Sequence, residues 1–146
     1  MKLTSPAFNQ EGEIPEKFTC DGEDINPRLE ISETPERAKS LALIVEDPDA
    51  PGGTFTHWTV WNIDPDVGAI EEDETPEGAI EGSTDFGSIG YGGPCPPSGT
   101  HRYFFKLYAL EEEINLEAGA GKSDLETAIK ERVIDSSELM GKYSRE

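Results

Sequence analysis

Three dense runs of hydrophobic and β-branched residues mark the chain, and polar segments rich in Gly and Pro separate them. The run at residues 40–46, S-L-A-L-I-V-E, is continuously apolar and predicts a central strand that is buried on both faces. The aromatic and β-branched runs Thr54–Ile63 and His101–Leu110 predict two further strands. Leu139–Tyr143 indicates a last short strand.

Side chains along a strand alternate between its two faces, so each predicted strand presents a defined set of residues to one side. In the second strand that set is Phe55, His57, Thr59 and Trp61, and in the third it is His101, Tyr103, Phe105 and Leu107. Each set contains one of the two histidines of the chain.

One good helix is predicted, near the C-terminus. Ser123–Glu126 fits a capping box, with Glu three residues after Ser. Leu125, Ala128, Ile129 and Val133 then follow at helical spacing. The polar segment Asp64–Gly82 has no helical period and is predicted to be a long connection. Ser83–Pro97 is rich in Gly and is predicted to be an ordered loop whose backbone passes close to another part of the chain.

Length and charge narrow the class of protein. The chain has 146 residues, which predicts one domain, 1–146, of mainly β structure with one or two helices. Lys and Arg number 12 against 31 Asp and Glu, a formal charge of -19, and such a surface argues against nucleic acid or anionic lipid as a partner. No apolar run of about 20 residues and no signal-peptide pattern is present, which predicts a cytoplasmic protein without membrane insertion.

The two cysteines, Cys20 and Cys95, are too few for a disulfide-dense secreted scaffold and too isolated for a four-thiolate zinc site. We therefore expect free thiols. A single Cys20–Cys95 bridge is the alternative.

If the three predicted strands are neighbours, one end of them gathers candidate chemistry. Asp47 and Asp49 follow the first strand, and His57, His101 and Tyr103 lie on the other two. A carboxylate can accept an imidazole N–H, and a protonated imidazole can donate to an oxyanion. These residue types together fit a pocket for a phosphate or carboxylate group, in which neighbouring carboxylates are expected to raise the histidine pKa values.

Other interpretations of these residues stay open. The histidines can be structural, and Asp47 and Asp49 can cap the turn that follows the strand. His and Asp are also zinc ligands, but no close spacing such as H-x-x-x-H is present. No G-x-S-x-G elbow points to a hydrolase.

Ordered motifs run along nearly the whole chain. They are I-P-x-x-F-T-C-D-G at 14–22, N-P-x-L at 26–29, D-P-D-A-P at 47–51, T-H-W at 56–58, T-D-F-G-x-x-G-Y-x-G-P at 84–94, P-P-x-G-x-H-R-Y at 96–103 and E-L-M-G-K-Y at 138–143. With these motifs the chain resembles the phosphatidylethanolamine-binding protein family, also called the Raf kinase inhibitor-like family, and within it the short bacterial and archaeal branch.

The resemblance implies two antiparallel β-sheets with peripheral helices and one anion pocket near the surface. Matching motifs place in that pocket Asp47, Asp49, His57, Pro96, Pro97, His101 and Tyr103. The family pocket takes phosphate, phosphorylated head groups or acetate. Some relatives inhibit kinases or serine proteases, and no family-wide enzymatic reaction is implied.

The chain ends at Glu146, without the C-terminal helix that flanks the pocket in the eukaryotic branch. This implies a more open pocket, or one covered by Cys20–Asp24 or by a second subunit in a homodimer.

Three functions are thus compared. The leading hypothesis is non-enzymatic binding of a small anion or phosphorylated ligand, without a cofactor, in which His57 and His101 donate to the anion. The second is a protein-interaction module that inhibits a protease or kinase, for which Tyr91, Pro94 and Asp64–Gly82 would have to be exposed. The third is a small hydrolase or metal-dependent enzyme that uses the two histidines.

Overall fold

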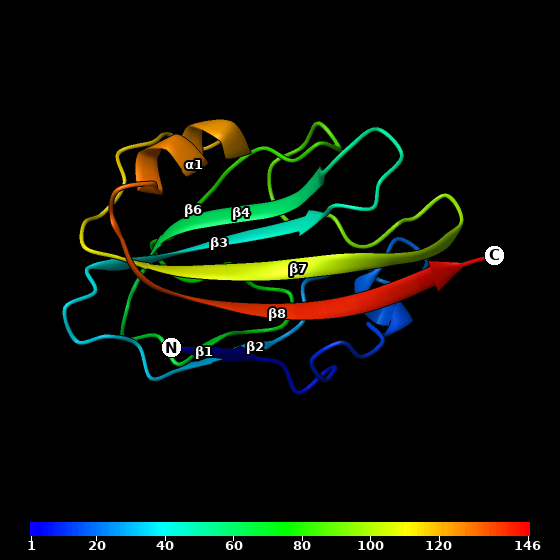
Figure 1. The fold of residues 1–146 in the computed structure, drawn as a ribbon, viewed down its shortest axis with the longest axis horizontal. Helices are drawn as coiled ribbons and strands as arrows, with labels where there is room; N and C mark the ends of the chain where they lie inside the picture. The colour runs from blue at the N-terminus through cyan, green and yellow to red at the C-terminus, as the bar shows by residue number, and fades with distance from the viewer.

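Two antiparallel β-sheets form the protein, and the computed structural model describes all 146 residues (Figure 1). The larger sheet has the strand order β6-β4-β3-β7-β8, and the smaller has the order β1-β2-β5. The elements are β1 (Lys2–Thr4), the 3-10 turn η1 (Glu16–Phe18), β2 (Leu29–Ser32), β3 (Ser40–Asp47), β4 (Phe55–Ile63), β5 (Ala69–Ile70), β6 (Ile80–Glu81), β7 (Gly99–Leu110), α1 (Lys122–Ile129) and β8 (Val133–Arg145). The predicted mainly β class is confirmed, with a single α-helix.

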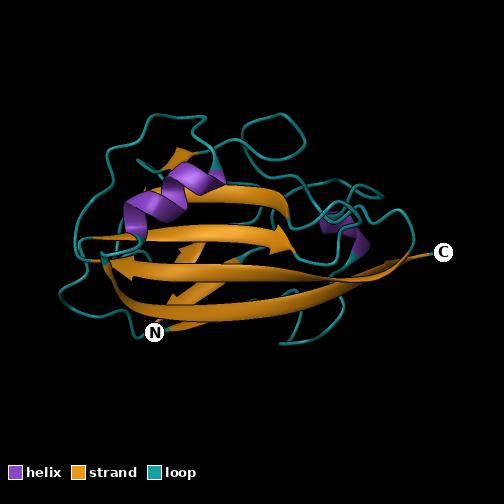
Figure 2. Cartoon of the chain, turned by 45° about the horizontal axis from the view of Figure 1, so that its top comes forward, coloured by secondary structure: helices purple, strands orange, loops and turns teal.

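Strand β3 is central because both of its faces are covered. All eight of its residues are buried, as the continuous apolar run predicted. Leu41, Leu43 and Val45 face a core of 20 residues between the two sheets, whereas Ala42 and Ile44 face a smaller cluster under α1. Figure 2 shows the helix lying across one face of the larger sheet. No helix of the structure is long and apolar enough to cross a bilayer.

The helix differs from its prediction at both ends. It begins at Lys122 after Gly121, which has no side chain to cap it, and its first backbone hydrogen bond runs from the N–H of Leu125 to the carbonyl of Gly121. Ser123 therefore lies inside the first turn. Val133 does not extend the helical face: it starts β8, pairs with Leu110 and is 37% exposed. The predicted last short strand is in fact the C-terminal part of this 13-residue strand.

A β-bulge in β4 overturns the predicted alternation of that strand. Val45 pairs with Trp58 and Glu46 pairs with Thr56, which leaves His57 without a partner on β3. A bulge re-aims the side chains that precede it. Phe55 and His57 consequently line one cavity, whereas Thr59 and Trp61 pack on the other side of the sheet around Gly82 and the helix.

Candidate functional site

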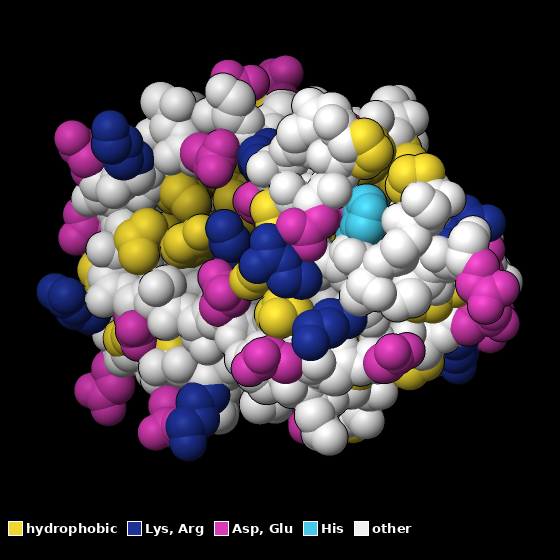
Figure 3. Space-filling model, turned by 45° about the vertical axis from the view of Figure 1, so that its right-hand side comes forward, with side chains coloured by type: hydrophobic (Ala, Val, Ile, Leu, Met, Phe, Trp, Pro, Cys, Tyr) yellow, Lys and Arg dark blue, Asp and Glu magenta, His cyan; other side chains and the backbone are white.

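One cavity of about 160 Å³ lies where β3 ends and β4 and β7 begin. These ends meet because the strands are antiparallel neighbours, with Asp47 paired to Phe55 and Glu46 paired to Phe104. The cavity is lined by Asp47, Ala50, Pro51, Phe55, His57, Phe86, Cys95, Pro96, Pro97, His101 and Tyr103. Six of the seven residues proposed from sequence therefore surround one space, and Figure 3 shows a histidine at a hollow bordered by hydrophobic side chains.

His101 is held by Asp47. Its Nδ1 atom lies 2.6 Å from Oδ2 of Asp47, and both residues are buried. The other carboxylate oxygen, Oδ1, accepts the backbone N–H of Asp49 at 2.7 Å. Since a carboxylate accepts, Nδ1 of His101 carries the proton and the Nε2 edge of the ring is left for the cavity.

His57 is held by a backbone carbonyl instead of a carboxylate. Its Nδ1–H donates to the oxygen of Gly92 at 2.7 Å. Burial lowers the pKa of His57 below its ordinary 6.5, although the Gly92 carbonyl and the charge of Asp47 oppose this shift. The raised pKa expected from neighbouring carboxylates is therefore wrong for His57, because desolvation outweighs the more distant charge.

Tyr103 lies between the two histidines. Its ring stacks on His101 with an interplanar angle of 24° and meets the His57 ring edge-on at 84°. The hydroxyl is buried and makes no hydrogen bond of normal geometry within the protein. Burial, with help from the charge of Asp47, raises the pKa of Tyr103, so the hydroxyl keeps its proton at neutral pH.

Asp49 is the one proposed residue that does not line the cavity. Its carboxylate oxygens accept from Nε and Nη2 of Arg102 at 2.9 and 2.8 Å, and Oδ2 also accepts the Arg102 backbone N–H. Arg102 follows His101 on β7 and so points to the opposite side of that strand. Asp49 thus ties the turn after β3 to β7 and does not orient a histidine.

Two aromatic side chains that were not among the predicted site residues, Phe55 and Phe86, form a wall of the cavity. The rings of Phe55 and Phe86 lie 4.8 Å apart, and Phe86 also contacts the edge of His57 at 5.2 Å. A Cβ atom at Gly92 would overlap the Phe86 ring, so the glycine allows this wall and the His57 contact to coexist. Phe86 lies within the motif T-D-F-G, which was the available signal.

Cys95, which lines the cavity, forms a disulfide with Cys20, so the expectation of free thiols is wrong. The fold brings the two together: the Cys20 N–H bonds to the carbonyl of Pro94, and the Tyr91 hydroxyl donates to the carbonyl of Phe18. A Cβ at Gly93 would overlap the Phe18 carbonyl oxygen, so this loop does pass close to another segment, as its glycines predicted.

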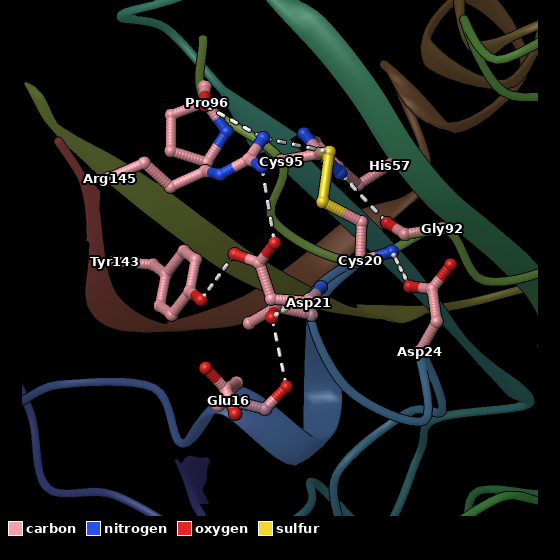
Figure 4. Close-up of a disulfide and its surroundings, with 12 residues drawn as sticks. Glu16, Cys20, Asp21, Asp24, His57, Gly92, Cys95, Pro96, Tyr143 and Arg145 are labelled. Carbon is pink, nitrogen blue, oxygen red and sulfur yellow. Dashed lines mark hydrogen bonds and ion pairs between the residues drawn. A yellow bond between two sulfur atoms is a disulfide. The ribbon is translucent and has the colours of Figure 1, made fainter. Parts of the chain in front are cut away.

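The disulfide sits in a small polar network (Figure 4). Arg145 approaches Sγ of Cys95 at 3.7 Å through Nη1 and Oδ1 of Asp21 at 3.2 Å through Nη2. The Tyr143 hydroxyl donates to the other oxygen of Asp21 at 2.6 Å. These contacts join the end of β8 to the turn after η1 and to the loop that carries Pro96. The segment Cys20–Asp24, expected as a possible cover, contributes no residue to the cavity lining.

No group of three or more His, Cys, Asp or Glu side chains is arranged to hold a metal ion. Asp47 is bonded to His101, and His57 is bonded to a carbonyl, so the two imidazoles and the carboxylate are not gathered on one point. The geometry gives the metal-site alternative no support.

Comparison with known proteins agrees with the motifs. The sequence model of the family described as phosphatidylethanolamine-binding protein matches residues 4–144. A UPF0098 protein of Methanothermobacter thermautotrophicus is 49% identical over 150 residues, which cover 99% of each chain.

Two solved structures share the whole fold. A Chlamydia trachomatis protein described as a homologue of phosphatidylethanolamine-binding protein is 42% identical, with a TM-score of 0.95 over 99% of this chain and 97% of that one. Escherichia coli YbcL, described as a member of the mammalian family, is 32% identical, with a TM-score of 0.93 over 99% and 98% of the two chains. The protein therefore belongs to the phosphatidylethanolamine-binding protein family.

Proposed function

We propose that the cavity between His57 and His101 binds a small oxyanion or a phosphorylated head group without catalysing a reaction. One observation carries this proposal. Each imidazole is fixed through Nδ1 by an acceptor of the protein, and each is left with its Nε2 edge at the same cavity. The ring of Tyr103 lies against both imidazoles and completes this part of the lining.

The rest of the lining supports a ligand with a small polar end. Its walls are the apolar side chains of Phe55, Phe86 and the prolines, and a volume of about 160 Å³ suits a group of a few heavy atoms. Neither histidine is hydrogen-bonded to a serine or threonine hydroxyl that it would activate as a nucleophile. This supports binding over hydrolysis.

The test is a calorimetric titration of phosphate and phosphoethanolamine into the wild type, His101→Ala and a matched control. Thr100→Ala is that control, because Thr100 precedes His101 on β7 but is exposed and bonds Ser144. We expect binding to the wild type and to Thr100→Ala, and at least tenfold weaker binding to His101→Ala. Absence of binding to the wild type, or equal binding to all three, contradicts the proposal.

The protein-interaction alternative meets only one of its three conditions: the connection Asp64–Gly82 is largely exposed. Pro94 is buried, and Tyr91 is half-buried with its hydroxyl bonded to Phe18. We therefore retain anion binding as the proposed function.

A cytoplasmic location also stays a proposal. Disulfides are rare in reducing cytosol outside hyperthermophiles, so the Cys20–Cys95 bridge restricts this proposal to a cytoplasm in which such a bridge persists. Cell fractionation with alkylation of free thiols before lysis tests both points at once.

A further inference from the structure

The two halves of the Cys20–Cys95 disulfide have different surroundings. Cys20 is exposed, and its Sγ atom accepts no hydrogen bond within the protein. Cys95 is half-buried, and its Sγ atom accepts from Nη1 of Arg145 at 3.7 Å. Figure 4 shows the guanidinium on the Cys95 side of the bridge. One end of the disulfide is therefore open to solvent, and the other lies beside a fixed positive charge.

These differences give thiol–disulfide exchange a preferred direction. A thiolate attacks one sulfur of a disulfide and expels the other, and the rate depends on access to the first and on how readily the second leaves as a thiolate. The exposure of Cys20 favours attack at its sulfur. The guanidinium of Arg145 stabilises the negative charge that develops on the sulfur of Cys95. Access and leaving-group charge thus favour the same direction.

Further contacts hold Arg145 at the sulfur and also define which thiols can approach. Nη1 donates to the carbonyl of Pro96 at 3.4 Å, and Nη2 lies 3.2 Å from Oδ1 of Asp21. The Tyr143 hydroxyl donates to Oδ2 of Asp21 at 2.6 Å and fixes that carboxylate. Because Asp21 adjoins Cys20 and the chain has a formal charge of -19, this surface repels an anionic thiol and accepts a neutral or cationic one.

We propose that the Cys20–Cys95 bridge is a reversible exchange site for small neutral or cationic thiols, which attack Sγ of Cys20 and expel Cys95 as a thiolate beside Arg145. With a dithiol, a new bond forms between one of its sulfurs and Cys20 as the protein disulfide breaks, and the electron pair stays on Cys95. The second thiol loses its proton to solvent and attacks its own sulfur in the mixed disulfide, which releases Cys20. The dithiol ends as a cyclic disulfide, and the protein has gained its two electrons.

The exchange is reversible because other contacts keep the two segments together. The backbone N–H of Cys20 donates to the carbonyl of Pro94 at 3.1 Å, and the hydroxyl of Tyr91 donates to the carbonyl of Phe18 at 2.7 Å. Neither bond involves sulfur, so both persist after reduction. The two thiols then stay opposite each other at a high effective concentration, which favours closure of the same bridge. This chemistry does not depend on the proposed binding of an anion.

The first measurement locates the attack in the wild type. Folded protein is treated briefly at pH 8 with cysteamine, a cationic monothiol, then quenched with acid and mapped by mass spectrometry. We expect about fivefold more adduct on Cys20 than on Cys95. Equal adducts, a majority on Cys95 or complete resistance to cysteamine overturns the proposal. The anionic thiol 2-mercaptoethanesulfonate, compared at equal thiolate concentration and low salt, should react about threefold more slowly. Equal rates would contradict the selection by charge.

The second measurement tests Arg145. The rate of reduction by dithiothreitol is compared in the wild type, Arg145→Gln and Lys142→Gln. Lys142 is the matched control, because it is another cation of β8 and has no contact with the disulfide. We expect Arg145→Gln to be reduced about threefold more slowly and Lys142→Gln at the wild-type rate. Reduction of Arg145→Gln as fast as the wild type overturns the role of the guanidinium.

A third measurement separates stabilisation of the thiolate from a change in access. In Cys20→Ser the thiol of Cys95 is free, and its alkylation by iodoacetamide should rise at lower pH than in Cys20→Ser/Arg145→Gln. Coincident pH profiles contradict the proposal. Reversibility is tested on the reduced wild type with cystamine, the disulfide of cysteamine, as the oxidant. The intramolecular bridge and the original urea midpoint should return, and a product made of linked chains would overturn the reversible exchange.

Discussion

The buried carboxylate of Asp47 bonds at once to Nδ1 of His101, at 2.6 Å, and to the backbone N–H of Asp49, at 2.7 Å. Asp47 therefore has both a site role and a structural one. We expect Asp47→Asn to lower the free energy of unfolding by about 1.5–3 kcal/mol, because hydrogen bonds to a charged group are lost or weakened in a buried setting. Urea denaturation at pH 7 measures the change.

A double-mutant cycle separates the two roles of Asp47. If the His101 bond carries most of the effect, Asp47→Asn should cost much less in a His101→Ala background than in the wild type. Equal costs in the two backgrounds would assign the stabilising effect to the Asp49 turn instead.

The ion pair of Asp49 and Arg102 is expected to make the stability of the protein depend on pH in strong acid. Its hydrogen bonds to Arg102 lower the pKa of Asp49 from 3.8 to about 2. A carboxylate with a lowered folded pKa stabilises the protein above its unfolded pKa and loses that effect as pH falls through the folded value. Because the pair is partly exposed, we expect Asp49→Asn to cost only about 0.5–1 kcal/mol at pH 7.

The difference between wild type and Asp49→Asn should shrink as pH is lowered from 4 toward about 2, the pKa of Asp49. Urea midpoints at intervals across this range measure it. Arg102→Gln serves as the partner control, since it removes the same pair and should show the same pH profile. A difference that stays constant down to pH 2 would contradict the prediction.

Because His57 is buried, we expect the protein to lose stability in mild acid. Burial lowers its pKa in the folded state below the ordinary 6.5, so the unfolded chain binds more protons just below that pH. Stability then rises with pH in this window and falls when the pH drops below about 6.5, with a slope of at most about 1.4 kcal/mol per pH unit from this one group. Denaturation of wild type and His57→Gln at pH 7, 6 and 5 measures the effect. We expect a flatter profile in the variant, and parallel profiles would exclude His57 as the cause.

The strands that carry the site were predictable from hydrophobic pattern, whereas their order in the sheet was assumed and is given by the structure. The buried run that became β3 and the aromatic runs that became β4 and β7 place Asp47, His57 and His101 at one end of adjacent antiparallel strands. Residues on a strand also alternate reliably in β7, where His101 and Tyr103 face the cavity as predicted.

The errors come from features that depend on partners far away in sequence. The bulge at His57 is a mismatch between β4 and β3, which neither strand shows alone. Asp49 lies outside the cavity because its carboxylate accepts two hydrogen bonds from the guanidinium of Arg102, which lies 53 residues later in the chain. Cys20 and Cys95 meet across 75 residues, so their pairing depends on how the loops pack and not on local pattern.

That long separation makes the disulfide a strong stabiliser. A bridge restricts the unfolded chain, and typical contributions are about 2–4 kcal/mol. We expect Cys20→Ser/Cys95→Ser to lower the free energy of unfolding by about that amount, and a dithiol reductant to lower that of the wild type similarly. The double variant is its own control, because its urea midpoint should not respond to the reductant. A wild type equally stable with and without reductant would contradict the prediction.

At Gly93 the loop that carries Cys95 and Pro96 packs closely against the backbone of Phe18 and Thr19. A Cβ atom there would overlap the carbonyl oxygen of Phe18 and lie 2.9 Å from Cα of Thr19, so backbone would have to move. We expect Gly93→Ala to cost at least about 1–3 kcal/mol and to weaken phosphate binding, because the displaced loop carries Cys95 and Pro96. Gly52→Ala is the matched control: its Cβ would have no atom within 4 Å, so neither property should change. Urea denaturation and calorimetry on both variants test this, and a Gly93→Ala protein as stable as Gly52→Ala would show that the two loops are not tightly packed.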